Sequence, residues 1–169
     1  EKNKIELEEI GLILNDHNSN KISSSAIREN LKAGKIELAN KDLKRNFCVA
    51  GKVIKGDQRG RTIGIPTANL EYPLNTITIP YGVYAVETII EGNTYFGIVN
   101  FGIRPTFNKD KPIVEAYLFD FDNDIYDKDI EILFHKQIRQ EKKFNDIKEL
   151  LNQINIDIAE AKKILKYGN

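Results

Sequence analysis

The spacing of hydrophobic residues divides the chain into a helical start, a strand-rich middle and a helical end. Near the start, apolar residues recur as on one face of a helix, behind a run of serines that can cap its first turn. We expect Ser24 or Ser25 to be the N-cap and Gly34 to end this helix. The same spacing predicts a second short helix over Ile36 to Leu43.

The hydrophobic period changes at Phe47, where short runs rich in Val, Ile, Tyr and Phe begin. Gly-Asn, Asp-Asn and Pro separate these runs, which is typical of strands joined by turns. In chain order the runs are FCVAGKVI, IPYGVYAVETII, TYFGIVNF, PIVEAYLFDF and KDIEILF. Since no helical pattern interrupts them, we expect consecutive antiparallel strands in a closed or nearly closed barrel. The change of period places a boundary between residues 1–45 and residues 46–169.

Helical spacing returns near the C-terminus as two successive apolar stripes. The first stripe runs from Phe144 to Ile154 and the second from Ile158 to Leu165. Between them, Asp157 and Glu160 have the spacing of a capping box, which predicts the start of a separate helix. We expect both helices to pack on the barrel.

Composition narrows the classes of function. The chain has 169 residues, enough for one domain with a full core, and its 25 basic and 25 acidic residues cancel. A neutral chain without a long apolar run has no general reason to bind nucleic acid or to enter a membrane, so we expect neither partner. Its single cysteine, Cys48, lies in an apolar run, which indicates a buried thiol and a cytoplasmic protein. The lack of Met suggests a fragment or a processed product.

The segment GDQRGRTIGIPTANL, after the first predicted strand, is the main candidate for anion binding. Gly56, Gly60 and Gly64 are four residues apart, which matches neither a Walker A motif nor the Rossmann fingerprint. Arg61 and its basic neighbours make the segment cationic on a neutral chain. Glycine and arginine can bring bare backbone and positive charge to a phosphate, but composition alone favours a plain hairpin loop.

The end of this segment adds two oxygen ligands. In an extended stretch, Thr67 and Asn69 point to the same side, next to the rigid Pro66. A hydroxyl and an amide carbonyl are few ligands for a divalent cation, but Mg²⁺ keeps waters and takes charge balance from phosphates. The alternative is that both residues only cap a turn.

A carboxylate shares a strand face with large apolar residues in PIVEAYLFDF. Alternation places Glu115 on the same face as Ile113, Tyr117, Phe119 and Phe121. Because burying an unpaired carboxylate is unfavourable, this acid is either neutralised by a partner or kept for chemistry. A structural ion pair and exposure on an edge strand are the alternatives.

Acidic residues just downstream have the spacing of a calcium loop. Asp120, Asp122, Asp124 and Glu131 fall at EF-hand positions 1, 3, 5 and 12. Position 6 is Ile125 where the motif requires Gly, and both flanks read as strands, so we do not expect calcium binding. We expect the Asp-Asn-Asp segment to form a hairpin turn.

Taken in order, these motifs resemble the riboflavin kinase module of bacterial bifunctional FAD synthetases. The resemblance runs over residues 47 to about 165 and includes GxxxGRxxGIPTANL, YGVYAV, NFGIRPTF, VEAYLFDF and IRQEKKF. The segment ISSSAIRENLKAGKIELANKDL is similar to the region that ends the nucleotidyltransferase domain of these enzymes. The His-containing motif that should precede it is absent from the sequence.

The resemblance implies a six-stranded Greek-key barrel that transfers the γ-phosphate of MgATP to the 5′-hydroxyl of riboflavin, giving FMN and ADP. It implies that Glu115 is the general base, that Thr67 and Asn69 hold Mg²⁺, and that Arg139 and Phe144 lie near the flavin. The cofactor-binding residues that it implies are Gly56, Gly60, Arg61, Gly64, Pro66, Thr67, Asn69, Arg139 and Phe144.

The resemblance also implies that residues 1–45 are the helical tail of a missing nucleotidyltransferase domain and residues 46–169 the kinase domain. We therefore expect no adenylyl transfer from FMN to FAD by this chain. The alternative of a different class is a non-catalytic flavin- or nucleotide-binding module. Glu115 discriminates between them, because only a kinase needs a carboxylate that faces the reacting hydroxyl.

Overall fold

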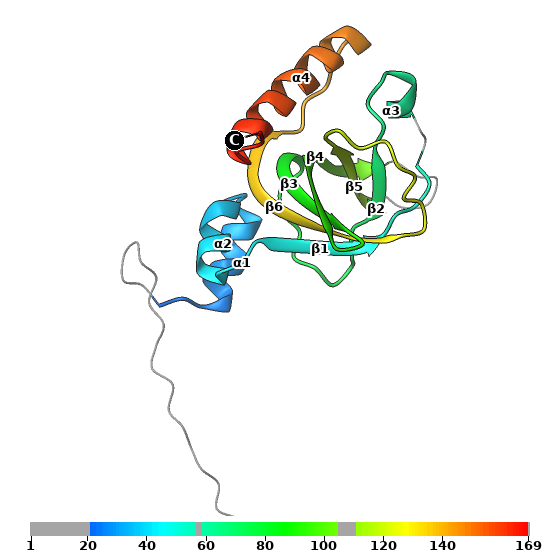
Figure 1. Ribbon diagram of the computed structural model, residues 1–169. Coiled ribbons are helices and arrows are strands. Elements are labelled where there is room, and N and C mark those ends of the chain that lie inside the picture. Colours follow the sequence, from blue (N-terminus) through cyan, green and yellow to red (C-terminus); the bar gives the residue numbers. More distant parts are fainter. Residues whose placement is uncertain (1–20, 57–58, 105–110, 169) are drawn as a thin grey trace, which may run out of the picture.

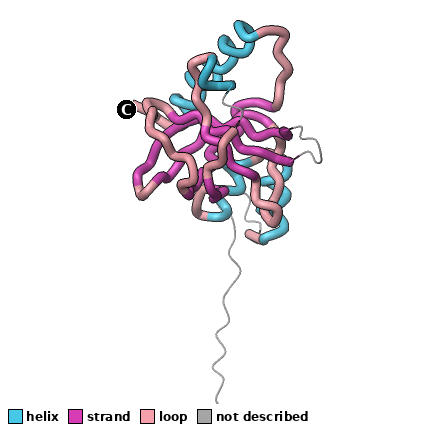
Figure 2. Tube along the Cα trace, turned by 90° about the vertical axis from the view of Figure 1, so that its right-hand side faces the viewer, coloured by secondary structure: helices cyan, strands magenta, loops and turns pink. Residues whose placement is uncertain are grey.

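The computed structural model describes residues 21–56, 59–104 and 111–168. The described residues form six antiparallel strands, which curl around a common core, with helices at the periphery (Figures 1 and 2). The strands are β1 (Phe47–Lys52), β2 (Ala68–Glu71), β3 (Gly82–Ile90), β4 (Asn93–Arg104), β5 (Lys111–Leu118) and β6 (Asp129–Gln140). The helices are α1 (Ser24–Lys32), α2 (Ile36–Leu43), α3 (Arg59–Thr62) and α4 (Ile147–Ile164).

The strand order is β1-β6-β3-β4-β5-β2, and every neighbouring pair is antiparallel. The two edges approach each other at one isolated bridge, where the N–H of Ile54, two residues beyond β1, donates to the Asn69 carbonyl at 2.8 Å, so the six strands form a half-barrel. Strands β3, β4 and β5 lie side by side in the sheet in the order in which they follow one another in the chain. Strand β6 instead crosses back and pairs with β3 and β1.

The connection between β5 and β6 corrects one prediction. Since β2 already pairs with β5, the chain must leave this strand and cross to the far side of β3. The Asp-Asn-Asp segment at residues 122–124 lies in this crossover, so the hairpin turn predicted there is wrong. The Asp124 carboxylate instead accepts from the Tyr126 N–H at 3.0 Å, which stabilises a local turn.

The barrel core follows from the two-residue period of the strands. Val99 and Phe101 of β4 are fully buried, and so are Val114 and Ala116 of β5, within one hydrophobic cluster. The residues that alternate with them, Glu115 among them, therefore face the outside of the barrel. This outer face is where the candidate site lies.

Helices α1 and α2 pack as a pair beside β1 and β6 (Figure 1). The N-cap of α1 is Ser23, whose Oγ accepts from the Ala26 N–H at 3.2 Å, so the predicted caps Ser24 and Ser25 are wrong by one or two residues. Gly34, with a φ of 74°, follows the end of α1 as predicted.

The helix pair shares the core of the barrel. Leu31, Ile36 and Ala39 belong to the same hydrophobic cluster as the strands. Asn40 adds polar contacts, since its carbonyl accepts from the Phe47 N–H and its amide donates to the Phe134 carbonyl, both at 2.7 Å. The helix pair is therefore joined to the barrel by apolar and polar contacts.

The C-terminal segment forms one helix, α4, where the sequence predicted two. It begins at the N-cap Asp146, whose carboxylate accepts from the Glu149 N–H at 2.7 Å. Asp157, the predicted cap of a second helix, lies inside α4 and is 1% exposed. Arg139 binds the Asp157 carboxylate. This carboxylate therefore does not cap backbone N–H groups, and the helix continues through Asp157. In the described part of the chain, no helix is long and apolar enough to cross a membrane.

Helix α4 packs on the outer face of the barrel, as predicted. Its Ala161 is fully buried in a second hydrophobic cluster with Val83 and Ala85 of β3 and Ile98 of β4. The helix covers β3 and parts of β4 and β6, and it leaves the outer face over β5 and β2 to other segments (Figure 1). The outer face of the barrel is thus divided into a covered apolar part and a polar part.

Candidate functional site

Three polar side chains form a row across β2, β5 and β4 on the outer face of the barrel. Asn69 lies opposite Glu115, and Glu115 lies opposite Asn100, in the antiparallel pairing of these strands. Opposite residues of such a pair share one face, with Cβ atoms about 4.5–5.5 Å apart. A carboxylate is thereby placed between two carboxamides.

Glu115 is half-buried, and the Asn100 amide donates to its Oε2 at 3.4 Å. Among the residues whose side chains the structure describes, which leave out Arg59, Arg104 and Lys111, no Lys, Arg or His forms an ion pair with it, so the alternative of a structural ion pair finds no support there. Its strand β5 lies between β4 and β2 and is not an edge strand, which removes the other alternative. The apolar neighbours predicted for its face are partly confirmed, since Ile113 and Phe119 are buried on the outside of the barrel.

Asn69 is 4% exposed, and its Oδ1 has no hydrogen-bond partner among the described residues. Its amide donates to the Thr67 carbonyl at 3.3 Å, which turns the carbonyl oxygen of the side chain away from that contact. Burying a polar atom without a hydrogen-bond partner lowers the free energy of unfolding by about 1–3 kcal/mol, so we expect a bound ligand to contact this oxygen. Thr67 itself is half-buried and lines the neighbouring cavity.

The glycines of the loop have structural reasons of their own. A Cβ at Gly56 would lie 2.5 Å from the Asn69 amide nitrogen, and one at Gly60 would collide with the Ile65 carbonyl. Gly64 has a φ of 80° and open space around it. Gly56 thus makes room for the carboxamide of Asn69, Gly60 permits a tight turn, and Gly64 alone offers bare backbone to the outside.

A cavity of about 420 Å³ lies on the inner side of β2 and β5, where Ala68, Ala116 and Leu118 line it; the three residues of the row face the other side of these strands and do not line it. Arg61, Pro66 and Thr67 line it from one side, and the β5–β6 connection over residues 121–126 lines it from the other. Arg61 comes from α3, a single helical turn that the sequence did not predict. The structure therefore brings three of the predicted loop residues together around one opening.

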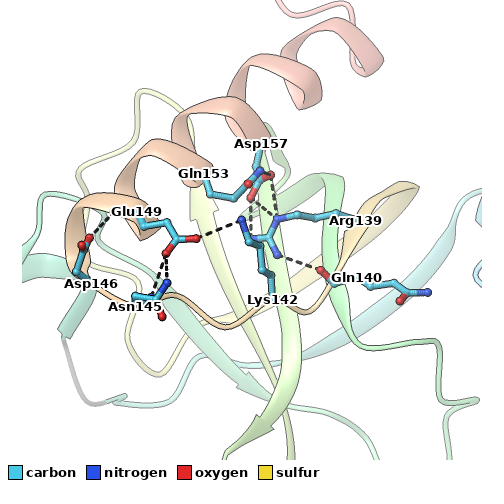
Figure 3. A network of polar contacts seen from close by, with 8 residues as sticks. All are labelled: Arg139, Gln140, Lys142, Asn145, Asp146, Glu149, Gln153 and Asp157. Carbon is cyan, nitrogen blue, oxygen red and sulfur yellow. Dashed lines mark hydrogen bonds and ion pairs between the residues drawn. The ribbon is translucent and has the colours of Figure 1, made fainter.

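Arg139 lies against α4 (Figure 3), and neither it nor Phe144, which precedes that helix, lines this cavity. The Nε and Nη2 atoms of Arg139 contact the Asp157 carboxylate at 2.9–3.0 Å, and the guanidinium lies 5.6 Å from the centroid of the Phe144 ring. Gln153 also donates to Asp157, at 3.0 Å. Arg139 is thereby committed to holding α4 against β6.

The polar row nevertheless continues towards Arg139. Asn100 lies opposite Val83 of β3, and Val83 lies opposite Arg139 of β6. Three strand spacings therefore separate Glu115 from Arg139, roughly 14 Å across the sheet. Glu115, the predicted base, and Arg139, one of the two predicted flavin-side residues, thus lie along one line across the sheet.

The turn that leads into α4 carries a second polar group of contacts (Figure 3). The Asn145 N–H donates to the Glu149 carboxylate at 3.1 Å, and the Lys142 ammonium lies 3.3 Å from it. These contacts, the backbone hydrogen bond first, hold the pKa of Glu149 below its usual value. They order the segment that follows Arg139.

The place of two residues in this region was missed by the sequence analysis. Asn100 could have been noticed because Asn is unfavourable inside a strand, yet it stands in the middle of TYFGIVNF. Asp157 was noticed for the wrong reason, as a cap, because its partner Arg139 lies 18 residues away. In the part of the chain that is described, no group of three or more His, Cys, Asp and Glu side chains could hold a metal ion.

Comparison with known families finds a match to the riboflavin kinase (flavokinase) model over residues 43–165. The bifunctional riboflavin kinase/FMN adenylyltransferase of Bacillus subtilis is 48% identical over 144 residues, which cover 83% of this chain and 46% of that protein. The enzyme of the same name from Escherichia coli K12 is 39% identical over 145 residues, with 85% and 46% coverage. The chain thus spans about half the length of these curated relatives.

Two solved structures have a similar fold. A crystal structure described as a macrolide-efflux protein from Streptococcus pneumoniae superposes with a TM-score of 0.82 at 32% identity, covering 91% of this chain and 50% of that one. A riboflavin kinase from Trypanosoma brucei superposes with a TM-score of 0.51 at 20% identity, covering 72% of this chain and 80% of that one. At that identity, the second likeness shows the fold alone.

Proposed function

Because the chain belongs to the riboflavin kinase family, we propose that it transfers the γ-phosphate of ATP to the 5′-hydroxyl of riboflavin, giving FMN and ADP. The observation that carries this proposal is Glu115, a half-buried carboxylate on the outer face of the barrel that forms no ion pair with any described side chain and stands between Asn69 and Asn100. A binding module would have no use for such a group.

In the proposed reaction, Glu115 accepts the proton of the 5′-hydroxyl while the oxygen forms its bond to the γ-phosphorus. The bond between the γ-phosphorus and the bridging oxygen breaks, and ADP leaves with that oxygen. Phosphoryl transfer depends mainly on positioning and on charge stabilisation. The half-buried position and the contact with Asn100 support a fixed direction for the carboxylate.

The residues present fit a Mg²⁺ ion. The buried Oδ1 of Asn69 lacks a partner among the described residues, and Mg²⁺ favours such oxygen ligands, completing its shell with water and phosphate oxygens. Asn69 and Thr67 would hold the ion, which would neutralise charge on the ATP phosphates. Gly56 of the loop supports this placement of the ion, because its lack of a side chain leaves space for the Asn69 carboxamide.

The nucleotide would occupy the cavity between the loop and the β5–β6 connection. Arg61 supplies positive charge at its rim, Thr67 lines it, and Gly64 offers open backbone nearby. The flavin would lie on the other side of Glu115, towards the foot of α4. There Phe144 supplies an aromatic ring, and Arg139 would shape the wall through its pairing with Asp157.

The test is to incubate the chain with riboflavin, ATP and Mg²⁺ and to separate the flavins by chromatography. We expect FMN and ADP in equal amounts. Folded protein that quenches riboflavin fluorescence but forms no FMN would contradict the proposal and support a non-catalytic flavin-binding module.

We further propose that these 169 residues do not convert FMN to FAD. Their match to the riboflavin kinase model covers residues 43–165, and the curated relatives that carry both activities in their names are about twice as long. FMN supplied with ATP should therefore yield no FAD. Formation of FAD and pyrophosphate by enzyme shown free of contaminants would contradict this.

A further inference from the structure

Asn100 occupies a position that its own packing does not explain. It lies inside β4, a strand of 12 residues, although Asn is among the residues that strands disfavour. Its neighbours Val99 and Phe101 are fully buried in the barrel core, while Asn100 is exposed on the outer face. Hydrophobic burial therefore gives no reason for an Asn at this position.

The contacts of Asn100 do suggest a reason. Its Nδ2 donates to the Glu115 Oε2 at 3.4 Å, from the residue directly opposite in the neighbouring strand. Asn69 flanks Glu115 on the other side but uses its own amide for the Thr67 carbonyl. The two carboxamides thus differ, since Asn69 presents a free oxygen and Asn100 presents a donor to the carboxylate.

Two cations at the Arg139 end of the row are engaged elsewhere. Arg139 pairs with Asp157, and Lys142 pairs with Glu149. Asn100 is accordingly the side chain that donates to Glu115 in the described part of the chain.

A second carboxylate explains why a neutral amide stands here. Gly102 follows Asn100 on the same face of β4, and a Cβ at Gly102 would collide with the Glu141 Oε1 and lie 4.0 Å from the Asn100 Nδ2. The Asn100 amide therefore donates to the Glu115 carboxylate and has the Glu141 carboxylate near it. A neutral donor stabilises Glu115 without adding charge beside Glu141, whereas an Asp at this position would be a third negative charge.

We propose that Asn100 is a positioning residue for Glu115: it holds one carboxylate oxygen and leaves the other free to face the reacting hydroxyl. This inference rests on the proposed function of Glu115 as the general base. Fixing the carboxylate matters because a displacement of about 1 Å can slow a reaction roughly 100-fold. Asn100 itself touches neither substrate nor metal in this proposal.

Two substitutions separate donation from mere space-filling. Asn100→Ala removes the donor and the bulk, whereas Asn100→Asp keeps the shape, removes the donor and adds a negative charge. We expect both to lower kcat roughly 10- to 100-fold, with KM values for riboflavin and ATP within about twofold of the wild type. Near-normal kcat in Asn100→Asp would overturn the proposal, because shape alone would then suffice.

Asn93 provides a matched control on the same strand. It lies at the hairpin between β3 and β4, roughly 24 Å along the strand from Asn100, and its amide donates to the Glu91 carbonyl at 3.5 Å. Asn93→Asp makes the same chemical change and should leave kcat unaltered. Thermal unfolding of each variant shows whether it is folded at the assay temperature. If Asn100→Ala is not folded, the kcat of Asn100→Asp alone tests the proposal.

A double-mutant cycle with Glu115→Gln tests the route of the effect, under single-turnover conditions with enzyme in excess. If Asn100 acts through Glu115, Asn100→Ala should cause no further loss in the Glu115→Gln background. The same loss in both backgrounds would overturn the positioning role. Near-normal turnover of Glu115→Gln alone would instead refute the assignment of the base, whereas a slow Glu115→Gln with a normal Asn100→Ala refutes only this inference.

Discussion

Replacing Asp157 by Asn would remove the negative charge from a carboxylate that is 1% exposed and that binds the guanidinium of Arg139 through two nitrogens. Gln153 also donates to this carboxylate, at 3.0 Å. The substitution leaves Arg139 without its counter-charge where α4 meets β6 (Figure 3). The predicted result is a loss of stability together with a looser attachment of α4.

The magnitude follows from the burial of the pair. Removing one partner of a buried ion pair costs about 3–5 kcal/mol, because the remaining charge stays desolvated. Since the Arg139 side chain is 20% exposed and can reach some water, we expect the lower end, about 3 kcal/mol. For a chain of this size, that corresponds to a melting temperature lower by roughly 6–12 °C.

The assay is thermal and urea unfolding of Asp157→Asn, Arg139→Met and the double variant. The double variant should recover most of the lost stability, because it leaves no lone charge at the interface. The control is Glu160→Gln on the same helix. Glu160 pairs with Lys163, and the two side chains are 49% and 76% exposed, respectively. That change should cost less than about 0.5 kcal/mol.

Two results would refute the reasoning. One is an Asp157→Asn variant as stable as Glu160→Gln, and the other is a double variant whose loss equals the sum of the single losses. If α4 borders the flavin site as proposed, KM for riboflavin should rise in Asp157→Asn while KM for ATP changes little. Equal changes in both constants would argue against that placement of the flavin.

Other substitutions test the proposed chemistry. Glu115→Gln should leave riboflavin and ATP binding largely intact and slow FMN formation about 10²- to 10⁴-fold, the usual contribution of general base catalysis; rapid-quench assays would show near-normal turnover if the assignment is wrong. Asn69→Ala and Thr67→Ala should weaken ATP binding in Mg²⁺ far more than in EDTA, as measured by calorimetry, and equal losses would indicate a structural role. Gly56→Ala should reproduce the Mg²⁺-dependent defect, because its Cβ would displace the Asn69 carboxamide, and unchanged binding would contradict that account. Gly64→Ala is expected to lower stability by about 1 kcal/mol or more in thermal unfolding, since its φ of 80° is strained for any side chain, and no loss would show that the loop relaxes.

Local sequence patterns were sufficient for most individual elements. The helix predicted over Ile36 to Leu43 is found at those residues, and each run of β-branched and aromatic residues forms a strand. Such elements can be predicted because their signals lie within a few residues of one another. For α1 these signals are a repeat of apolar residues and the Gly34 that follows, which the structure shows at a φ of 74°. The same local reading selected Thr67, Asn69 and Glu115 as candidates, and their roles remain predictions.

Interactions between distant segments were beyond that reading. The sequence indicated two helices at the C-terminus, because nothing near Asp157 reveals that Arg139 of β6 will bind its carboxylate. The sequence likewise indicated a hairpin at residues 122–124. The pairing of β2 with β5 excludes this hairpin, and it could not be foreseen because it joins segments more than 40 residues apart.

The residue types and the periodicity of the chain determined that it forms a β-barrel with a cationic, glycine-rich loop and a carboxylate on one strand face. Only the tertiary structure decided that Asn69, Glu115 and Asn100 stand in one row and that Gly56 makes room for the Asn69 carboxamide. The physical reason is that strand register is selected by the burial of the whole core and by closure of the barrel. A side chain on one strand therefore acquires its neighbours only when every strand is in place.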